Sequence, residues 1–208
     1  PAPAEASEPA ATETPAEAME PEIVRIGWGG SPDTLNPGTA VLSEAYIVFE
    51  LVYDSMFEPQ LDGTYKPGLA ESWEVSDDGT VWTFKIHDDV KFHDGEPLTA
   101  KDIAFSYNFY QKHEDFPFLP VYTEYFESVE ATDDSTLVIT LTEAIPNMES
   151  QLVFLYVIPE HIWAEYDDPT AAVVLQEHGV HLDRRIEHRR ERLFGARKRR
   201  GRRRGRGM

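Results

Sequence analysis

The sequence contains no cysteine, and this absence removes several kinds of chemistry at once. Disulfide bonds, cysteine-ligated zinc, iron–sulfur clusters and thiol nucleophiles are all excluded. No run of about 18 apolar residues occurs, which is the length that a helix needs to span a bilayer. The motifs G-x-S-x-G and H-E-x-x-H and a phosphate-binding loop are also missing, and we predict that the chain is not an enzyme.

Basic residues are scarce in most of the chain. Positions 1–170 hold six Lys or Arg side chains against 34 Asp or Glu, which gives a net charge of −28. A field of that sign repels nucleic acid, so we expect this acidic part to bind none. Positions 171–208 reverse the balance, with 13 basic and four acidic side chains. The apolar fraction of 41% is enough for a packed core, so the chain as a whole is not disordered.

The two ends of the chain differ in composition from the middle. Residues 1–21 use only Pro, Ala, Glu, Ser, Thr and one Met, and we predict a disordered linker that holds an exported domain away from a membrane anchor. The Arg-rich stretch 171–208 favours a frameshift or truncation product, so we expect a non-native or disordered basic tail. The alternative is an interaction module whose tail binds an acidic partner or RNA.

Between these ends, turn signals and apolar spacing predict hairpins and separated helices. Asp-Gly dipeptides between alternating apolar runs indicate tight turns, and Thr99 with Asp102 forms a capping box that opens a helix. The segment 148–158 is compatible with helix or strand. The predicted strands are 72–75, 81–86, 129–131 and 137–141. Further helices are predicted to begin at Ser43 and, with Pro159 at the start, to span 160–166. This mixture indicates an α+β fold.

Aromatic side chains within the predicted strands and the Thr99 helix are assigned to the core. Burial of each contributes about 2–3 kcal/mol. The predicted core aromatics are Trp73, Trp82, Phe84, Phe92 and Phe105.

One short segment is dense in possible metal ligands. It contains His87, Asp88, Asp89, His93 and Asp94, which would be the ligands of a metal-dependent hydrolase. Asp residues in turns more often bond the backbone, and the two histidines do not share a helical face. We therefore predict no metal and no cofactor.

Two long runs carry a resemblance to a known family. They read GLAESWEVSDDGTVWTF over 68–84 and DVKFHDGEPLTAKDIAFS over 89–106, with shorter supporting matches at 33–37, 52–56 and 158–163. Over residues 22–166 the chain resembles the solute-binding proteins of peptide and nickel ABC importers, the oligopeptide- and dipeptide-binding type. The resemblance implies an N-terminal, incomplete part of a two-lobed, type II periplasmic-binding-protein fold.

The same resemblance implies a domain plan and a function. Residues 22–44 and 142–170 would belong to the larger lobe, and 45–141 would form a smaller subdomain. The protein would be a monomer, exported and lipid-anchored on the periplasmic or extracellular face of the membrane, and would deliver peptides or similar solutes to an ABC permease. Chelated nickel or a sugar remain possible ligands. Because the other cleft walls come from later sequence in the family, we expect the chain to be unable to bind alone.

Six residues are candidates for contact with the ligand. Val41, Leu42, Ser43 and Glu44 align with the ligand-edge loop of the family, where the backbone pairs with an extended peptide. Trp28 and Tyr46 stand beside turns that would border the cleft. Ser43 is predicted either to cap the following helix only, or to cap it and also line the cleft edge.

Overall fold

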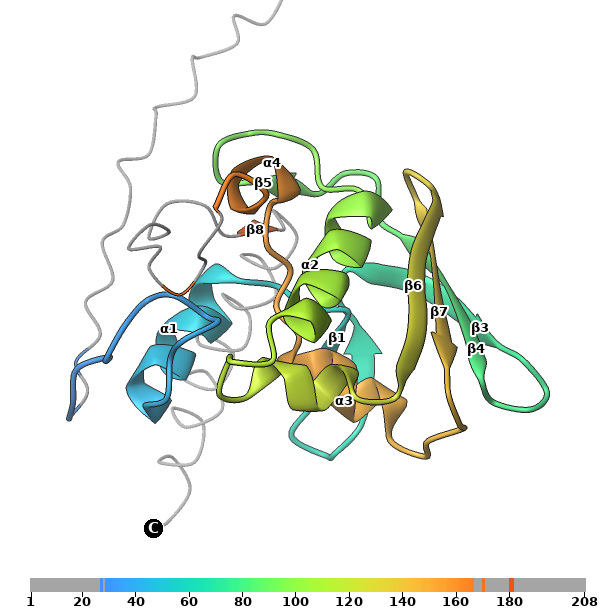
Figure 1. The fold of residues 1–208 in the computed structure, drawn as a ribbon, viewed down its shortest axis with the longest axis horizontal. Coiled ribbons are helices and arrows are strands. Elements are labelled where there is room, and N and C mark those ends of the chain that lie inside the picture. The colour runs from blue at the N-terminus through green and yellow to red at the C-terminus, as the bar shows by residue number, and fades with distance from the viewer. Residues whose placement is uncertain (1–26, 28, 167–169, 171–179, 182–208) are drawn as a thin grey trace, which may run out of the picture. The chain divides into compact units, whose positions relative to one another are not determined.

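The computed structural model describes residues 27, 29–166, 170 and 180–181 (Figure 1). Helices and strands are mixed along the chain, which confirms the predicted α+β class. The elements in order are α1 (Ser43–Val52), β1 (Phe57–Pro59), β2 (Tyr65–Pro67), β3 (Ala70–Val75), β4 (Val81–Ile86), β5 (Lys91–Phe92), α2 (Ala100–Lys112), the 3₁₀ helix η1 (Leu119–Thr123), β6 (Phe126–Asp133), β7 (Thr136–Leu141), α3 (Met148–Phe154), α4 (Glu160–Trp163) and β8 (Val180–His181).

A four-stranded antiparallel sheet with the strand order β3-β4-β7-β6 organises the core. Its register sets Trp82 opposite Ile139 and Phe84 opposite Leu137, so these four buried side chains share one face. Helix α2 packs on β6 and β7, as Figure 1 shows. The other face of the sheet carries polar side chains such as Lys85, as expected of an antiparallel sheet with one face in water.

Helix α2 begins and packs as its sequence predicts. The Thr99 backbone N–H and Oγ1 each donate to the Asp102 carboxylate over 2.9 Å, which is the predicted capping box. Ile103, Tyr107 and Tyr110 are fully buried on the face that meets the sheet and the neighbouring segments. The helix is therefore fixed both by its own first turn and by its apolar stripe.

Two amide side chains of α2 cover the edge of the sheet. Asn108 Nδ2 donates to the Val129 carbonyl over 3.0 Å, and Gln111 Nε2 donates to the Phe126 carbonyl over 2.8 Å. Both carbonyls belong to β6, which is an edge strand. These contacts satisfy backbone acceptors that would otherwise be open to pairing with another chain.

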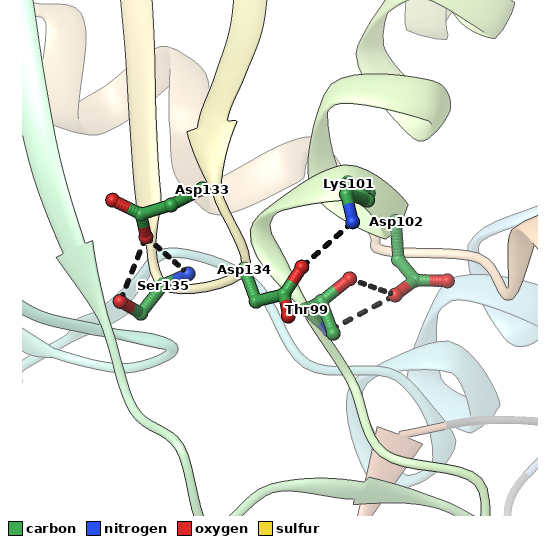
Figure 2. A network of polar contacts seen from close by, with 6 residues as sticks. All are labelled: Thr99, Lys101, Asp102, Asp133, Asp134 and Ser135. Carbon is green, nitrogen blue, oxygen red and sulfur yellow. Dashed lines mark hydrogen bonds and ion pairs between the residues drawn. The ribbon is translucent and has the colours of Figure 1, made fainter.

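The turn between β6 and β7 joins α2 to the sheet, and Figure 2 shows its side chains. Asp133 accepts hydrogen bonds from the Ser135 backbone N–H and hydroxyl, which closes the turn. Asp134 pairs with Lys101 over 2.7 Å, and its carbonyl accepts the Ala100 N–H over 2.8 Å. The start of α2 is thus held against this turn by one exposed ion pair and one backbone hydrogen bond.

The predicted turns are confirmed by their backbone. Gly79 has φ 75°, a conformation that favours glycine, and the Asp78 carboxylate accepts the Thr80 N–H two residues on. This turn joins β3 to β4, as the Asp-Gly signal indicates.

Several expectations need correction or lie beyond the described residues. The segment 148–158 divides into α3 and an extended, buried stretch from Leu155 to Ile158. Helix α4 ends at Trp163, so it is shorter than the sequence suggested. Among the predicted core aromatics, Trp73 and Phe105 are only partly buried. Trp73 lies on β3, an edge strand of the sheet, and Phe105 lies on the outer side of α2, so one side of each ring is open to solvent.

The linker 1–21 lies outside the described residues. Of the predicted tail 171–208, the structure describes two residues, Val180 and His181, which form β8 and pair with β5. None of the helices within the described part of the chain has the length and apolar character needed to cross a membrane.

Candidate functional site

The loop before α1 is held in place by Asp33. One oxygen of its carboxylate accepts the Val41 N–H over 2.8 Å and the other accepts the Leu42 N–H over 3.3 Å. Helix α1 starts at Ser43 with Leu42 as its N-cap, and no side chain caps it directly. The prediction that Ser43 caps the helix is wrong, because Ser43 already lies inside the first turn and its hydroxyl donates to Glu44 over 3.2 Å.

Asn36 shapes the same loop from the inside. Its side-chain oxygen accepts the Gly38 N–H over 2.9 Å, and its carbonyl accepts the Ala40 N–H over 3.1 Å. A Cβ on Gly38 would lie 2.5 Å from the ring of Phe116, which is buried, so only glycine fits there. The short segment from Asp33 to Gly38 therefore sets the position of the loop that the sequence analysis assigned to the ligand edge.

An exposed apolar surface continues from this loop. We call it the apolar edge. It consists of Val41 (52% exposed), Leu42 (45%), Phe118 (44%), Val121 (62%) and Phe154 (44%), together with the half-buried Tyr46 and Tyr122 that join them. Large apolar side chains gathered in this way on a surface typically mark a contact with a ligand or another protein surface.

Aromatic contacts connect the parts of the apolar edge. The ring of Tyr46 lies 6.2 Å from that of Phe118, and the ring of Tyr122 stacks on Phe154 at 5.1 Å. The Tyr46 hydroxyl donates to the Ala40 carbonyl over 3.2 Å. Burial, helped by electrostatic repulsion from the neighbouring Tyr122 and Asp33, raises the pKa of Tyr46 to about 12. Tyr46 is therefore neutral at pH 7 and supports the edge by packing and hydrogen bonding.

The segments that build the apolar edge contain no basic side chain. Positions 31–56 and 113–166 lack Lys and Arg, while Asp33 and Glu44 stand beside the exposed loop. All five lysines of residues 27–166 fall between positions 66 and 112. The chemistry that this surface offers is apolar contact, backbone groups and negative charge.

Replacing Asp33 by alanine should loosen the loop without unfolding the chain. Desolvation raises the pKa of Asp33, but hydrogen bonds from Val41 and Leu42 together outweigh it and hold the pKa below the ordinary 3.8. A lowered carboxylate pKa means that this stabilisation is present above pH 3.8 and is lost as the pH falls through the folded-state pKa. We expect the Val41 and Leu42 amides to exchange roughly three- to tenfold faster in D33A than in the unchanged protein at pH 7. In the unchanged protein, these amides should lose the same protection from exchange only at acid pH, where Asp33 is protonated.

The matched control for that experiment is Asp78→Ala. The pKa of Asp78 is also lowered, by hydrogen bonds from Ser76 and Thr80, but Asp78 belongs to the β3–β4 turn. D78A should leave the Val41 and Leu42 amides unchanged. Equal exchange at these amides in D33A and the unchanged protein would contradict the role given to Asp33.

The structure places five of the six predicted site residues. Val41, Leu42 and Ser43 are exposed, Glu44 is half-buried, and Tyr46 lies behind them. Trp28 lies outside the described residues.

The sequence analysis missed the second half of the apolar edge, which comes from η1, the loop before it and the end of α3. Phe118, Val121, Tyr122 and Phe154 lie more than 70 positions from Val41 in the sequence. The only local signal was the pair of Phe residues on either side of Pro117, in a segment otherwise typical of a turn.

The segment dense in possible metal ligands, for which no metal site was predicted, is divided between two contacts. His87 Nδ1 lies 3.9 Å from Asp89, and Asp94 contacts His161 Nε2 of α4 at 2.8 Å. Across 29–166 and the few other described positions, no three His, Asp or Glu side chains come together as a metal site would require. Here the side chains join neighbouring segments of the chain.

Comparison with known proteins places the chain in a family. Residues 64–175, more than half of the 208, match the model of the bacterial extracellular solute-binding proteins, family 5, middle region. The chain belongs to this family. A putative ABC transporter peptide-binding protein of Brucella ovis is 33% identical over 143 residues, which are 67% of this chain and 26% of that protein. The nickel-binding periplasmic protein of Escherichia coli is 37% identical over 87 residues, 42% of this chain and 16% of that protein.

Solved structures of the family share the fold. NikZ from Campylobacter jejuni in complex with Ni(L-His) aligns with a TM-score of 0.65 and 27% identity, over 72% of this chain and 30% of that one. The oligopeptide-binding protein AppA from Bacillus subtilis, in complex with a nonapeptide, aligns with a TM-score of 0.60 and 27% identity, over 65% of this chain and 27% of that one. The fold of this chain is therefore part of a type II periplasmic-binding-protein fold. The chain spans 26% of the length of the Brucella relative and 30% and 27% of the two solved chains.

Proposed function

We propose that this chain is part of the solute-binding component of an ABC importer and that it captures peptides or similar solutes. Its action would be binding and delivery to a membrane permease, with no bond made or broken. The observation that carries the proposal is the apolar edge, which Tyr46 links to the predicted ligand-edge loop: its hydroxyl bonds the Ala40 carbonyl and its ring contacts Phe118. The name of the Brucella relative, a putative ABC transporter peptide-binding protein, supports the same ligand class.

The geometry of the loop limits how a peptide could pair with it. The N–H groups of Val41 and Leu42 already donate to Asp33, and the Leu42 carbonyl accepts the Ala45 N–H. The first N–H groups of α1, at Ser43 and Glu44, have no acceptor within the helix itself. An extended ligand would therefore accept hydrogen bonds from the start of α1 and lay apolar side chains against Phe118 and Val121.

Several parts of the proposal follow from the family resemblance. The larger lobe would comprise 22–44 and 142–170, with 45–141 as the smaller subdomain beside it. A second lobe from further sequence would close over the ligand by hinge motion. We further propose export to the outer face of the membrane, lipid anchoring and a monomeric state. We also propose that this chain, with the other cleft walls supplied by further sequence, is unable to capture a solute alone beyond a millimolar contact at the apolar edge.

A titration with an apolar tripeptide would test the assignment. Adding Ala-Phe-Ala to the ¹⁵N-labelled chain should shift the amide signals of 41–46 and 118–122, with a dissociation constant on the order of millimolar. Phe118→Ala should weaken this binding by about fivefold, since an aromatic contact contributes roughly 1 kcal/mol. Leu61→Ala is the control, because Leu61 is fully exposed at the β1–β2 turn, away from the apolar edge in the sequence.

The titration has outcomes that would contradict the proposal. Triglycine, which has the same backbone but no side chains, should bind more weakly than Ala-Phe-Ala. Shifts spread evenly over the chain, shifts confined to other segments, or an equal loss of binding in Leu61→Ala would each remove the apolar edge as the ligand surface.

A further inference from the structure

A concave surface lies on the outer side of α2, built from a different set of residues than the apolar edge. It is a groove of about 520 Å³, and we call it the α2 groove. Ala104, Phe105 and Phe109 of α2 form its floor, and Ala131 of β6 forms one wall. None of these residues belongs to the apolar edge.

The floor of the α2 groove is aromatic and rigid. The rings of Phe105 and Phe109 lie 5.3 Å apart, and Phe109 packs edge-on against the fully buried Trp163 at 5.7 Å. Phe105 is partly open to solvent above this support. Two of its lining residues, Ala104 in the floor and Ala131 in the wall, have side chains too small to fill the groove.

Charge at the ends of the groove sets the chemistry it could accept. Lys101 and Lys112 both line the groove. Residues 27–166 contain only five lysines, against 26 acidic side chains, so two lysines at one groove are unusual for this chain. They are 11 positions apart on one helix, which corresponds to about 16 Å along the axis. Lys101 already pairs with Asp134 over 2.7 Å. Lys112 is exposed, and within the described residues it has neither an ion-pair nor a hydrogen-bond partner.

The end of the groove near Lys101 is less suited to an anion. Glu160 of α4 lines it there, and its negative charge acts on Lys101 together with that of Asp134. At the other end Lys112 stands in the last turn of α2. A ligand carboxylate would be attracted to Lys112 and repelled by Glu160, which gives it one orientation in the groove.

We infer that the α2 groove is a binding site for a small organic anion with an apolar body, whose carboxylate pairs with Lys112 and whose apolar part lies on Phe105 and Phe109. The apolar floor supplies most of the contact area, and the lysine selects the charge. This site is separate from the proposed peptide cleft. A negative result for this site therefore leaves the proposed function unaffected, and a negative result for the proposed function leaves this site unaffected.

Three probes that share one apolar body can test the inference. They are 4-phenylbutyrate, the uncharged 4-phenylbutan-1-ol and the cationic 4-phenylbutan-1-amine, each titrated into the ¹⁵N-labelled full chain. The carboxylate should shift the amides of residues 104–112 and of Ala131, with about three- to fivefold higher affinity than the alcohol, as one exposed ion pair provides. The amine should bind more weakly than the alcohol because of Lys112.

Two variants separate the charge from the shape of the groove. Lys112→Gln should lower the affinity for the carboxylate to that for the alcohol and leave the alcohol unchanged, whereas Lys66→Gln, at an exposed lysine of β2, should change neither. Ala131→Leu should fill the groove and weaken all three probes.

Four results would overturn the inference: no localised shift with the carboxylate, equal binding of the carboxylate and the amine, carboxylate binding that survives Lys112→Gln, or the same loss in Lys66→Gln. Lys112 is exposed on the surface, so its variant is expected to fold normally and the test does not depend on Ala131→Leu.

Discussion

Trp163→Ala should destabilise the chain more than any other single substitution considered for it. Trp163 is fully buried in α4, and its ring meets Phe109 of α2 at 5.7 Å. Removing a buried Trp leaves a large cavity and typically costs about 3–5 kcal/mol. Because small domains are stable by only about 5–15 kcal/mol, this is a large share of the total. Urea denaturation followed by circular dichroism should show the midpoint falling by roughly 2 M.

The control is Trp163→Phe, which keeps an aromatic ring in the same place. Trp163 Nε1 is buried with no hydrogen-bond partner in the described part of the chain, so losing it breaks no hydrogen bond. We expect a cost of only about 1–2 kcal/mol, from the smaller ring volume. Equal stability losses in the two variants would show that the aromatic contact between α4 and α2 does not contribute the expected free energy of unfolding.

Asp102→Ala should produce the second large effect, because one buried carboxylate joins two helices. It accepts the Thr99 N–H and hydroxyl at the start of α2, both at 2.9 Å. It also accepts the Glu160 N–H at the start of α4 over 3.3 Å. Alanine removes the capping box and leaves donors without an acceptor in a buried place, for an expected loss of about 2–4 kcal/mol.

Amide exchange would show whether Asp102 acts on both helices. In D102A the amides in the first turns of α2 and α4 should exchange faster than in the unchanged chain, while those of the sheet strands keep their rates. Asp134→Asn is the matched control in the same network, since Asp134 is exposed and pairs with Lys101 at the surface (Figure 2). Exposed ion pairs contribute about 0–1 kcal/mol, so this variant should be nearly as stable as the original chain. Faster exchange at α2 alone in D102A would mean that the bond to Glu160 is unimportant.

The elements that could be predicted from the sequence share one property: their signals act over a few residues. The Asp78-Gly79 turn needs a glycine at φ 75° and a carboxylate two residues before the bonded N–H, and both are visible in the sequence. The Thr99–Asp102 capping box spans three positions. The alternation of Leu137, Ile139 and Leu141 shows directly which face of β7 is buried.

The helix start at Ser43 shows where local reasoning failed. Serine before an apolar helical pattern is a good N-cap signal, yet the loop is anchored by Asp33, ten positions upstream. No rule over three or four residues can find such a partner. The same holds for Trp73 and Phe105, whose partial exposure depends on being at a sheet edge and on the outer side of a helix.

The sequence by itself determined the family, the α+β class, the turns and the buried face of β7, because repeated apolar spacing and short hydrogen-bonded motifs encode them locally. Only the tertiary structure decided which surfaces could bind anything. The apolar edge joins Tyr46 to Phe118 and Tyr122 to Phe154 across separate segments of the chain. The α2 groove is lined by Ala104 of a helix and Ala131 of a strand. Such surfaces arise from packing between distant parts of the chain, and no periodicity in the sequence records that packing.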